Sequence, residues 1–376
     1  MITSFKNNGK LKLLIIVSTR QEIIRLSEII KKCRHLFDVI LAHTGQNFDY
    51  NLNSVFFRDF ELERPEVYLE CIGKDYGETM GNVISKTYRL MADTKPDAVL
   101  ILGDSSSSFS VISAKQLKIP VIHLGAGNTS KNKKSPEEVN RIVIDGLADV
   151  NLSYTEHARR NLLQKGIDSE KIYVTGSPMA EVLRKNLKKI LESDIHIRLK
   201  QKKGNYILFY IHREESISTA ESLVSVMQTM NKLADKYGIS VLYSCHPQIS
   251  KKIEQTGIRF SPLVIQHEAL GFHDYNALQM NAFCVVSDSG TLPEEASFFT
   301  SIGHPFPAVC IRTTTERPEA VDKGIFITSD VDETSLLQAV GTAVELTVTG
   351  DNGRPVPDYA DENVSAKVVK IIQSHT

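Results

Sequence analysis

The stretch CVVSDSGTLPEE, residues 284–295, joins an apolar strand to a polar turn with one glycine and then to a helix start rich in carboxylates. In such a turn the backbone N–H groups of residues 290–292 and the positive end of the helix dipole point at one phosphate-sized spot beyond the strand. A carboxylate one turn further on, Glu294 or Glu295, is suited to accept hydrogen bonds from the hydroxyls of a sugar. The segment therefore predicts either a nucleotide site or an ordinary β–α connection whose serines cap a helix.

Similar apolar runs alternate with longer amphipathic stretches along the whole chain. The runs cover 11–18, 38–44, 97–104 and 120–127 in the first half and 205–211, 240–246, 282–290, 307–312 and 324–329 in the second. Continuous apolar strands that alternate with helices are typical of a parallel sheet covered on both faces. We therefore expect an α/β fold with two Rossmann-like, doubly wound parallel-sheet domains.

The 376 residues suffice for roughly two domains of ordinary size. We expect an N-terminal domain over 1–178, a helical, basic and polar connector over 179–204, and a C-terminal domain over 205–360. A last helix over 361–376 is expected to pack back on the N-terminal domain. Ligands of open parallel sheets bind beyond the carboxyl ends of the strands, so two domains that face each other would line a single cleft.

Charge and hydropathy exclude several classes of partner. Lys plus Arg, 44 residues, nearly balance Asp plus Glu, 45 residues, so the net charge of −1 does not favour binding to nucleic acid or to an anionic membrane. The chain has no apolar stretch of the ~20 residues that a membrane span needs, and the run 13–17 is too short for a signal-peptide core. We expect a cytoplasmic protein with reduced core thiols, since its five cysteines are scattered and form no CxxC pair.

Polar residues that could carry chemistry follow several of the predicted strands. Arg20 and Arg25 lie at the start of the first predicted helix, where a guanidinium can bind phosphate oxygens, although Arg25 also fits a surface position. His212 follows an apolar strand within HREE and could donate to a phosphate or move a proton. Gln46 and His246 also follow strands. HREE does not match HExxH and no cysteine pair is near, so no metal is expected.

A second group of carboxylates has two possible interpretations. Asp104 ends an apolar strand, and Glu137 and Glu138 open a helix behind Pro136 with Arg141 one turn on. Proline and acids at a helix start are ordinary capping. The same carboxylates could serve as general acids and bases. The absence of GxGxxG after the first strand favours a nucleotide sugar over a dinucleotide.

The ordered motifs resemble a known family over nearly the whole chain. They are STRQEIIRLS, HTGQNFDYNLN, LGDSSSS, HLGAGN, SPEEVNR, VTGSPM, HREES, CHP, GFHDYNALQ, SDSGTLPEE and RTTTERPEA. Together they are similar to the non-hydrolysing UDP-N-acetylglucosamine 2-epimerases. The forms GFHDYNALQ and SDSGTLPEE resemble the capsule and O-antigen branch that acts on UDP-2-acetamido-2,6-dideoxy-L-hexoses, as in UDP-N-acetyl-L-fucosamine synthesis.

This resemblance implies two domains of the GT-B type facing across a cleft, usually in a homodimer, with UDP or a UDP-2-acetamido sugar held mainly by the second domain. It implies elimination of UDP to a 2-acetamidoglycal and re-addition with the proton delivered to the other face, without a metal or redox cofactor. The residue roles carried over are these: Asp104, Glu137 and His212 in catalysis; Arg20, Tyr275, Ser289, Gly290, Thr291, Glu295 and Arg317 in nucleotide binding; Arg25, Gln46, Glu138, Arg141 and His246 at the substrate. Within the nucleotide set, Tyr275 would stack on uracil and Glu295 would bind the ribose.

The sequence departs from the family pattern in the first domain. The central glutamate of the H-x-E-A-G motif is Gly125, and the arginine usual two residues beyond that motif is Thr129. Ser18 and Gln21 stand where glycine and proline are usual. Three hypotheses follow: an epimerase in which Glu138, His123 or a water supplies the missing proton transfer, a UDP-sugar-binding homologue impaired in catalysis, or a related UDP-sugar hydrolase or transferase.

Overall fold

Two parallel sheets organise the chain in the computed structural model, which describes residues 4–45, 50–129, 135–211, 220–244, 253, 258–311 and 315–376. Unit 1 comprises Met1–Arg184 and Asp361–Thr376, and unit 2 comprises Lys185–Ala360. Every strand pair in both sheets is parallel. The predicted class of two parallel-sheet α/β domains is confirmed.

In the described part of unit 1 the sheet has the order β3-β2-β1-β4-β5-β6-β7. Its strands are β1 (Lys12–Val17), β2 (Asp38–His43), β3 (Val67–Tyr68), β4 (Ala98–Leu102), β5 (Val121–Ala126), β6 (Val150–Ser153) and β7 (Ile172–Val174). The order reverses between β1 and β4, so the connections leave these two strands in opposite directions. Such a reversal opens a crevice beyond the strands' carboxyl ends, where α/β proteins bind their ligands.

Helices cover both faces of this sheet. They are α1 (Arg20–Leu36), α2 (Tyr50–Asp59), α3 (Tyr76–Thr94), η1 (Ser106–Phe109), α4 (Ser110–Gln116), α5 (Pro136–Leu147), α6 (Glu156–Gln164), η2 (Ser169–Lys171), α7 (Pro178–Leu191), which runs on into unit 2, and α15 (Val364–Ser374). The consecutive β1 residues Leu13, Leu14, Ile15 and Ile16 are all 0% exposed. Because alternate strand residues point to opposite faces, both faces are buried.

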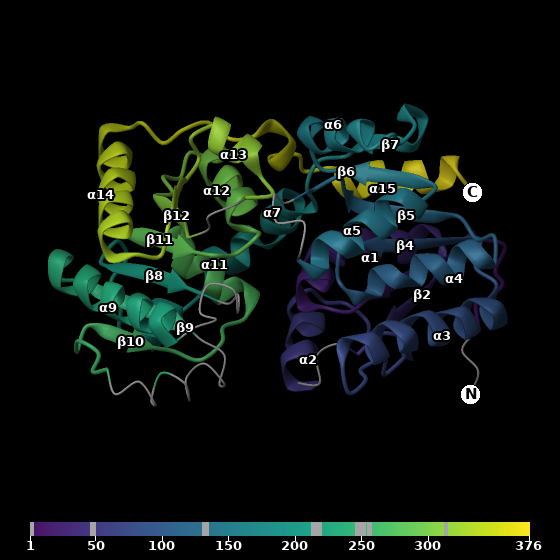
Figure 1. Cartoon of the computed structure of the whole chain (residues 1–376), viewed down its shortest axis with the longest axis horizontal. Coiled ribbons are helices and arrows are strands. Elements are labelled where there is room, and N and C mark those ends of the chain that lie inside the picture. The colour runs from purple at the N-terminus through teal and green to yellow at the C-terminus, as the bar shows by residue number, and fades with distance from the viewer. Residues whose placement is uncertain are drawn as a thin grey trace. The chain divides into compact units, whose positions relative to one another are not determined.

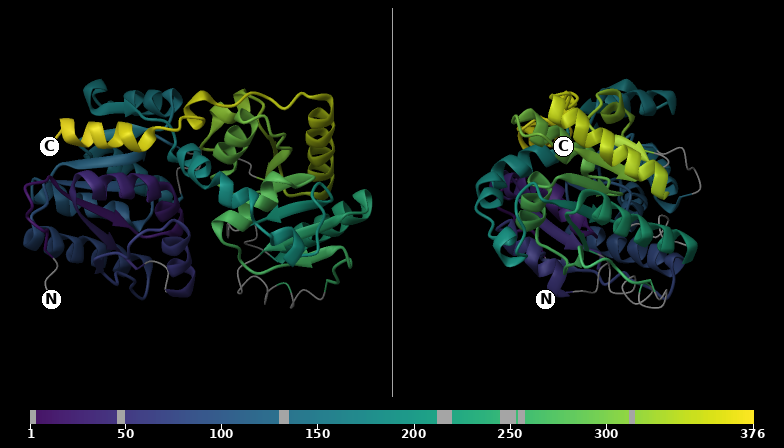
Figure 2. Two further views of the ribbon diagram at one scale, coloured as in Figure 1. Left: turned by 180° about the vertical axis from the view of Figure 1, so that it is seen from behind. Right: turned by 90° about the vertical axis from the view of Figure 1, so that its left-hand side faces the viewer.

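The last helix completes unit 1. α15 packs against α1, as Figure 2 shows from behind, where α15 is the yellow helix at the C-terminus. Its start is fixed by a buried carboxylate, since the backbone N–H of Ser365 donates to Glu181 at 2.7 Å and the Ser365 hydroxyl donates to the same side chain. The division between the units falls between Arg184 and Lys185, inside α7 and inside the stretch predicted as the connector.

The sheet of unit 2, within the described residues, has the order β10-β9-β8-β11-β12-β13. Its strands are β8 (Tyr206–Tyr210), β9 (Ser240–Ser244), β10 (Val264–Gln266), β11 (Cys284–Ser287), β12 (Ala308–Ile311) and β13 (Ile327–Ser329). The helices are α8 (Ile195–Arg198), α9 (Ala220–Tyr237), α11 (Phe272–Met280), α12 (Leu292–Ser301), α13 (Pro318–Asp322), α14 (Glu333–Thr349) and η4 (Pro357–Tyr359). The order reverses between β8 and β11, which places a second crevice at their carboxyl ends.

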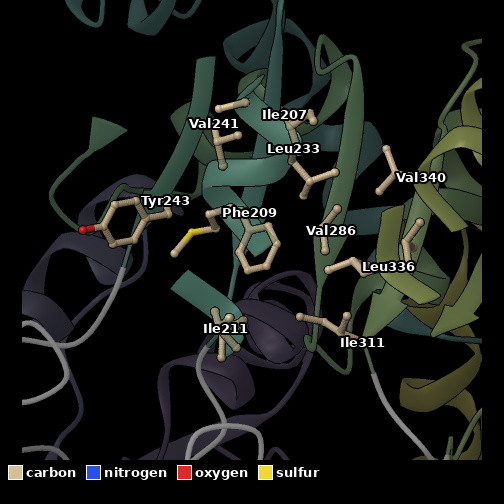
Figure 3. Close-up of a cluster of buried hydrophobic side chains, with 14 of the residues drawn as sticks. Ile207, Phe209, Ile211, Leu233, Val241, Tyr243, Val286, Ile311, Leu336 and Val340 are labelled. Atoms are coloured by element: carbon tan, nitrogen blue, oxygen red, sulfur yellow. The ribbon is translucent and has the colours of Figure 1, made fainter. Parts of the chain in front are cut away.

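A single apolar cluster holds α9 and α14 on one face of this sheet (Figure 3). Phe209 of β8 and Val286 of β11 meet Leu233 of α9 and Leu336 of α14, and all four are at most 2% exposed. Burying side chains of this size contributes about 1.5–3 kcal/mol each. The core therefore fixes the strand ends that carry the polar residues described below.

In the described part of the chain, no helix combines the length and the apolar character needed to cross a membrane. Cys33, Cys71, Cys284 and Cys310 are buried, and burial raises the pKa of Cys33 to about 12 and that of Cys71 to about 11. Cys245 lies outside the described residues. The four described thiols are core side chains, as the sequence predicted, and burial suppresses the thiolate form of Cys33, Cys71 and Cys284 by raising the pKa of each.

Candidate functional site

At the carboxyl ends of β1 and β4, unit 1 has a buried carboxyl that is bound to a chain of serine hydroxyls. Glu22, in the first turn of α1, is 3% exposed. The backbone N–H of Ser18 donates to it at 2.7 Å, and the Ser18 hydroxyl donates to its other oxygen at 3.1 Å. The Ser18 hydroxyl also bonds to that of Ser105 at 2.6 Å, and Ser105 bonds to Ser107 at 2.8 Å. The chain thus crosses from the end of β1 to the end of β4.

Burial raises the pKa of Glu22 to about 7, although the hydrogen bonds from Ser105, Ser18 and Thr19 lower it. Nothing in the sequence analysis singled out this residue. The available signal was the spacing of Thr19 and Glu22, which matches a capping box, and the Thr19 side chain does accept the Glu22 N–H at 3.3 Å. A cap explains why a glutamate lies here, but it does not explain the contact with Ser105.

The raised pKa of Glu22 should make the free energy of unfolding depend on pH. A carboxyl whose pKa is higher in the folded state binds its proton more tightly there, so this term favours folding below pH 4.5 and is lost as the pH rises to about 7. Glu22→Gln should therefore gain stability relative to the parent as pH rises through this window, by on the order of 3 kcal/mol at the upper end. Urea unfolding at several pH values measures the difference.

The control is Glu28→Gln on the same helix, where the carboxylate pairs with Lys31 at 2.8 Å near the surface. A difference between Glu22→Gln and the parent that stays constant with pH would contradict a raised pKa at Glu22.

Asp104 lies beyond β4 in a second network with α5. Its carboxylate forms an ion pair with Arg141, and Arg141 in turn binds Glu138 at 3.0 Å. Thr129 donates to the other oxygen of Glu138 at 2.5 Å, so this departure from the family pattern supports a buried carboxylate that is 2% exposed. The structure therefore brings together Asp104, Arg141, Glu138 and Thr129. The Asp104 side chain remains 32% exposed and accessible to a ligand.

Two further residues complete this network: Asn140, beside Arg141 on α5, and Tyr76 at the start of α3, which no motif in the sequence marked. The Asn140 side chain donates to the Asp104 carbonyl at 2.7 Å and to the Tyr76 hydroxyl at 2.9 Å. Burial raises the pKa of Tyr76, and the charges of Glu137 and Asp104 add to the effect while the hydrogen bond with Asn140 opposes it. Glu137 is exposed in the first turn of α5. Tyr76 and Asn140 are 64 residues apart, so only the fold shows that they meet.

Gly125, the main departure from the family pattern, occupies an irregular position in β5. Its φ is +86°, and the pairing of β5 with β6 shifts register between Leu124 and Ala126, as in a β-bulge. A Cβ at this residue would lie 3.2 Å from the hydroxyl oxygen of Tyr154, a side chain that is 1% exposed. The backbone therefore suits glycine, and Tyr154 fills the space in which a longer side chain would begin.

His123, one of the hypothesised substitutes for the missing glutamate, is held inside the unit. It is 1% exposed, with Nδ1 3.2 Å from the Asp145 carboxylate and Nε2 3.2 Å from the carbonyl oxygen of Gly103. Burial opposes the charge on Asp145, but the hydrogen bond and charge of His123 and the charge of Lys165 hold the pKa of Asp145 below its usual value. The imidazole therefore joins β5 to β4 and to α5, which disfavours it as the substitute.

The two predicted arginines of α1 have different environments. Arg20 is the first residue of α1 and is partly exposed. The Arg25 guanidinium lies over the Tyr154 ring, 5.9 Å from its centroid, at a cation–π distance. Arg25 thereby reaches the group that adjoins Gly125, whereas a surface position would have left it in solvent.

In unit 2, the turn that follows β11 has the geometry expected of a phosphate site. Residues 289–291 are partly exposed at the carboxyl end of β11, and α12 begins with no side-chain cap on its first turn. The Ser289 and Thr291 hydroxyls bond to each other at 2.9 Å. The Ser289 hydroxyl also accepts the backbone N–H of Thr291 at 3.3 Å, and the Ser287 hydroxyl accepts that of Ser289 at 3.0 Å. The N-cap residue of α12, Thr291, makes no side-chain bond to the first turn of the helix, so an anion can approach that turn.

Glu295 and Tyr275 lie close together beside this turn. Glu295 is 3% exposed and accepts a hydrogen bond from the Gln279 side chain at 3.0 Å. Burial, and after it the charges of Glu295 and Tyr210, raise the pKa of the Tyr275 hydroxyl. The ring of Tyr275 is partly exposed and lies 5.4 Å from that of Tyr210. The predicted ribose and base contacts thus come from neighbouring side chains of α12 and α11.

Arg317 is more buried than expected for an arginine whose role is to bind a phosphate. It is 6% exposed, with its guanidinium 3.8 Å from Glu294 and over the ring of Tyr359 at 5.7 Å from the centroid. Glu294 is 0% exposed, so Arg317 balances the charge of a fully buried carboxylate at the start of α12. Its predicted contact with a diphosphate stays a prediction.

Gln46, His212 and His246 lie outside the described residues, and their roles stay predictions. Within the described ranges, no three His, Cys, Asp or Glu side chains gather closely enough to hold a metal ion.

Comparisons with known proteins agree over nearly the whole chain. A family model described as UDP-N-acetylglucosamine 2-epimerase matches residues 31–373. The solved structure of UDP-N-acetylglucosamine 2-epimerase from Rickettsia bellii has a TM-score of 0.87 and 38% identity, and the match covers 97% of each chain. The Methanocaldococcus jannaschii UDP-GlcNAc 2-epimerase in complex with UDP-GlcNAc and UDP has a TM-score of 0.88 at 27% identity, over 97% of this chain and 100% of that one.

A relative with a different substrate also matches. The Pseudomonas aeruginosa protein named UDP-2,3-diacetamido-2,3-dideoxy-D-glucuronate 2-epimerase is 28% identical over 346 residues, which are 91% of this chain and 94% of that protein. The similar proteins therefore share a reaction at carbon 2 and differ in the sugar that their names specify.

Proposed function

We propose, since the chain belongs to the UDP-N-acetylglucosamine 2-epimerase family, that it inverts carbon 2 of a UDP-activated 2-acetamido sugar. The observation that carries the proposal is the uncapped start of α12 beside Glu295 and Tyr275, a constellation that matches a diphosphate, a ribose and a base. Structures of similar proteins that contain UDP or UDP-GlcNAc support the same ligand class for this chain.

Unit 2 would hold the UDP moiety. Ser289, Gly290 and Thr291 would bind the diphosphate through the hydroxyls and backbone N–H groups of the turn, Glu295 would bind the ribose hydroxyls, and the Tyr275 ring the uracil. Arg20, Arg317 and His212 would add positive charge or hydrogen-bond donors to the diphosphate. The buried Glu294 is already paired with Arg317, which leaves Glu295 as the carboxylate for the sugar hydroxyls.

Unit 1 would act on the sugar. Carbon 2 has no adjacent carbonyl to acidify its hydrogen, so elimination of UDP must first build positive charge at carbon 1, and carboxylates stabilise that charge. Asp104 and Glu137 are the proposed acid–base groups, and Arg25, Glu138, Arg141, Gln46 and His246 the proposed substrate contacts. Arg141 holds the Asp104 carboxylate in place by an ion pair. The reaction is proposed to need no metal or redox cofactor.

The finer assignment follows the motif resemblance. We place the substrate among UDP-2-acetamido-2,6-dideoxy-L-hexoses, as in UDP-N-acetyl-L-fucosamine synthesis for a capsule or other surface polysaccharide, and we propose a homodimer. GFHDYNALQ, which covers all of α11 except its last residue, and SDSGTLPEE, which ends in the first turn of α12, support this branch. Epimerisation of UDP-2-acetamido-2,6-dideoxy-L-hexoses in preference to UDP-N-acetylglucosamine would support the branch, and the reverse preference would contradict it.

A catalytically impaired UDP-sugar-binding homologue is the second candidate, because Gly125 lacks the usual carboxylate and Tyr154 occupies the adjoining space. Incubation with UDP-2-acetamido sugars in heavy water separates the two. An epimerase incorporates deuterium at carbon 2, whereas a binding protein shows tight UDP binding by calorimetry without exchange. Release of free UDP and sugar without deuterium at carbon 2 would instead indicate hydrolysis.

A further inference from the structure

The missing carboxylate leaves a gap in the proposed chemistry of unit 1. Epimerisation by elimination and re-addition needs a proton taken from one face of carbon 2 and a proton given to the other. Asp104 and Glu137 both lie on the α5 side of the site. Both carboxylate oxygens of Glu138 are already bound, one by Thr129 and the other by Arg141. His123 has a partner at each ring nitrogen. A further proton acceptor is required on the opposite side, toward β1.

The chain of hydroxyls from Glu22 reaches that side. Ser18 directly follows β1 and Ser105 follows β4, so the two hydroxyls, 2.6 Å apart, span the place at which the strand order reverses. Glu22 is buried behind Ser18, whereas Ser105 is partly exposed directly after Asp104. A proton can therefore pass between the crevice and the buried carboxyl although Glu22 itself is not exposed.

Arg25 connects the same helix face to the site of the missing carboxylate. Glu22 and Arg25 are three residues apart on α1 and so lie on one face. The Arg25 guanidinium covers the Tyr154 ring, and the Tyr154 hydroxyl adjoins Gly125. The family pattern usually has glycine at position 18, so the hydroxyl that joins Glu22 to Ser105 accompanies the loss of the carboxylate at Gly125 in this chain.

We propose that Glu22, acting through the hydroxyls of Ser18 and Ser105, receives and returns the carbon-2 proton in place of the carboxylate missing at Gly125. The inference rests on the proposed epimerase function. Glu22 is a positioning and relay residue, since Ser105 is the group that faces the substrate.

The step balances as a concerted transfer. The carbon-2 hydrogen leaves as a proton to the Ser105 hydroxyl, which passes its own proton to Ser18, and Ser18 passes one to the Glu22 carboxylate. The electrons of the carbon–hydrogen bond form the double bond between carbons 1 and 2, and UDP leaves with the electrons of the broken bond at carbon 1. In re-addition the bond from carbon 1 to UDP forms again and the Asp104 carboxyl donates a proton to the opposite face of carbon 2. In the reverse direction Asp104 takes that proton and Glu22 returns its own through the same hydroxyls. Proton exchange with solvent restores both carboxyls between turnovers.

The pKa of Glu22 suits this role. A relay carboxyl works best with a pKa near the operating pH, and burial brings that of Glu22 to about 7. The causes of this shift are burial and the hydrogen bonds from Ser105, Ser18 and Thr19. Charged residues of α1 and of its neighbours are not among them, including Arg20 and Arg25 on α1, Asp104 after β4, Arg58 and Asp59 on α2, and Lys367 and Lys370 on α15. The alternative is a purely structural cap at the start of α1.

The test compares Ser18→Gly, Ser105→Ala and Glu22→Gln with Ser27→Ala, which removes a buried α1 hydroxyl bonded to the Ile24 carbonyl at 2.8 Å. We expect each relay variant to lower the rate of carbon-2 deuterium exchange by about 10²–10⁴-fold, with UDP affinity by calorimetry unchanged and Ser27→Ala close to the parent. The pH–rate profile of the parent should have a limb near pH 7 that Glu22→Gln lacks.

Isotope effects distinguish a relay from a cap. The dependence of the rate on the deuterium fraction of the solvent should indicate several transferred protons in the parent. It should indicate fewer in Ser18→Gly, which keeps the backbone N–H that donates to Glu22. Parent-like exchange, pH profile and isotope dependence in Ser18→Gly would overturn the relay while leaving the epimerase function intact. A parent protein that binds UDP without any exchange would overturn both proposals.

Discussion

Asp104→Asn should lower the rate of carbon-2 epimerisation by about 10²–10⁴-fold, the contribution of one general acid or base. The substitution keeps the shape of the side chain but removes the charge that pairs with Arg141 and the ability to accept a proton. Arg141 retains Glu138 as a partner at 3.0 Å, so unit 1 should remain folded. Deuterium incorporation at carbon 2, measured at saturating substrate, gives the rate.

Asp97→Asn is the matched control. Asp97 precedes β4 as Asp104 follows it, and its carboxylate accepts the backbone N–H of Lys12 at 2.8 Å at the amino end of the sheet. We expect this variant to keep its exchange rate, because ligands of parallel sheets bind at the opposite end. Equal rates for Asp104→Asn and the parent would remove Asp104 from the mechanism.

Gly125→Glu should destabilise unit 1 and lower the rate of carbon-2 exchange below that of the parent protein, although it restores the carboxylate typical of the family. A non-glycine residue at φ +86° costs about 1–3 kcal/mol. The added Cβ would also lie 3.2 Å from the hydroxyl oxygen and 3.3 Å from the Cζ of the buried Tyr154. Overpacking of this kind adds about 1–3 kcal/mol. Thermal unfolding and deuterium exchange measure the two effects.

Gly166→Ala isolates the backbone part of this loss. Gly166 has a similar φ of +81°, and a Cβ there would meet no atom within 4 Å. Gly125→Ala should therefore destabilise more than Gly166→Ala, because Tyr154 adjoins only the former. A stable Gly125→Glu protein with a large gain in epimerisation would show instead that the native site merely lacks a carboxylate that its fold accepts.

The alternation of apolar runs was sufficient to predict two parallel-sheet domains, because buried parallel strands need continuous apolar sequence and helices on both faces. The turn at 287–295 was predictable for a related reason, since its strand, turn and helix are contiguous in the chain. Glu295 and Tyr275 lie 20 residues apart, yet they are brought together by adjoining helices, and their proximity emerged only from the structure.

The unit 1 site shows why the rest was not predictable. Glu22 looks like a helix cap in the sequence, and its contact with Ser105 depends on strand order rather than on spacing. The space beside Gly125 is filled by Tyr154 from the end of β6, and no motif marks that residue. Burial and long-range neighbours thus determine which polar groups can exchange protons.

Unit 1 is discontinuous along the chain, and this affects how the protein can be made and divided. During synthesis α15 emerges after the intervening Lys185–Ala360 segment, so the face of α1 that it covers stays open until that segment has left the ribosome. A fragment that ends at Arg184 would lack the Ser365 partner of Glu181 and expose apolar surface on α1. Residues 185–360, by contrast, are contiguous and can be cut out as one piece.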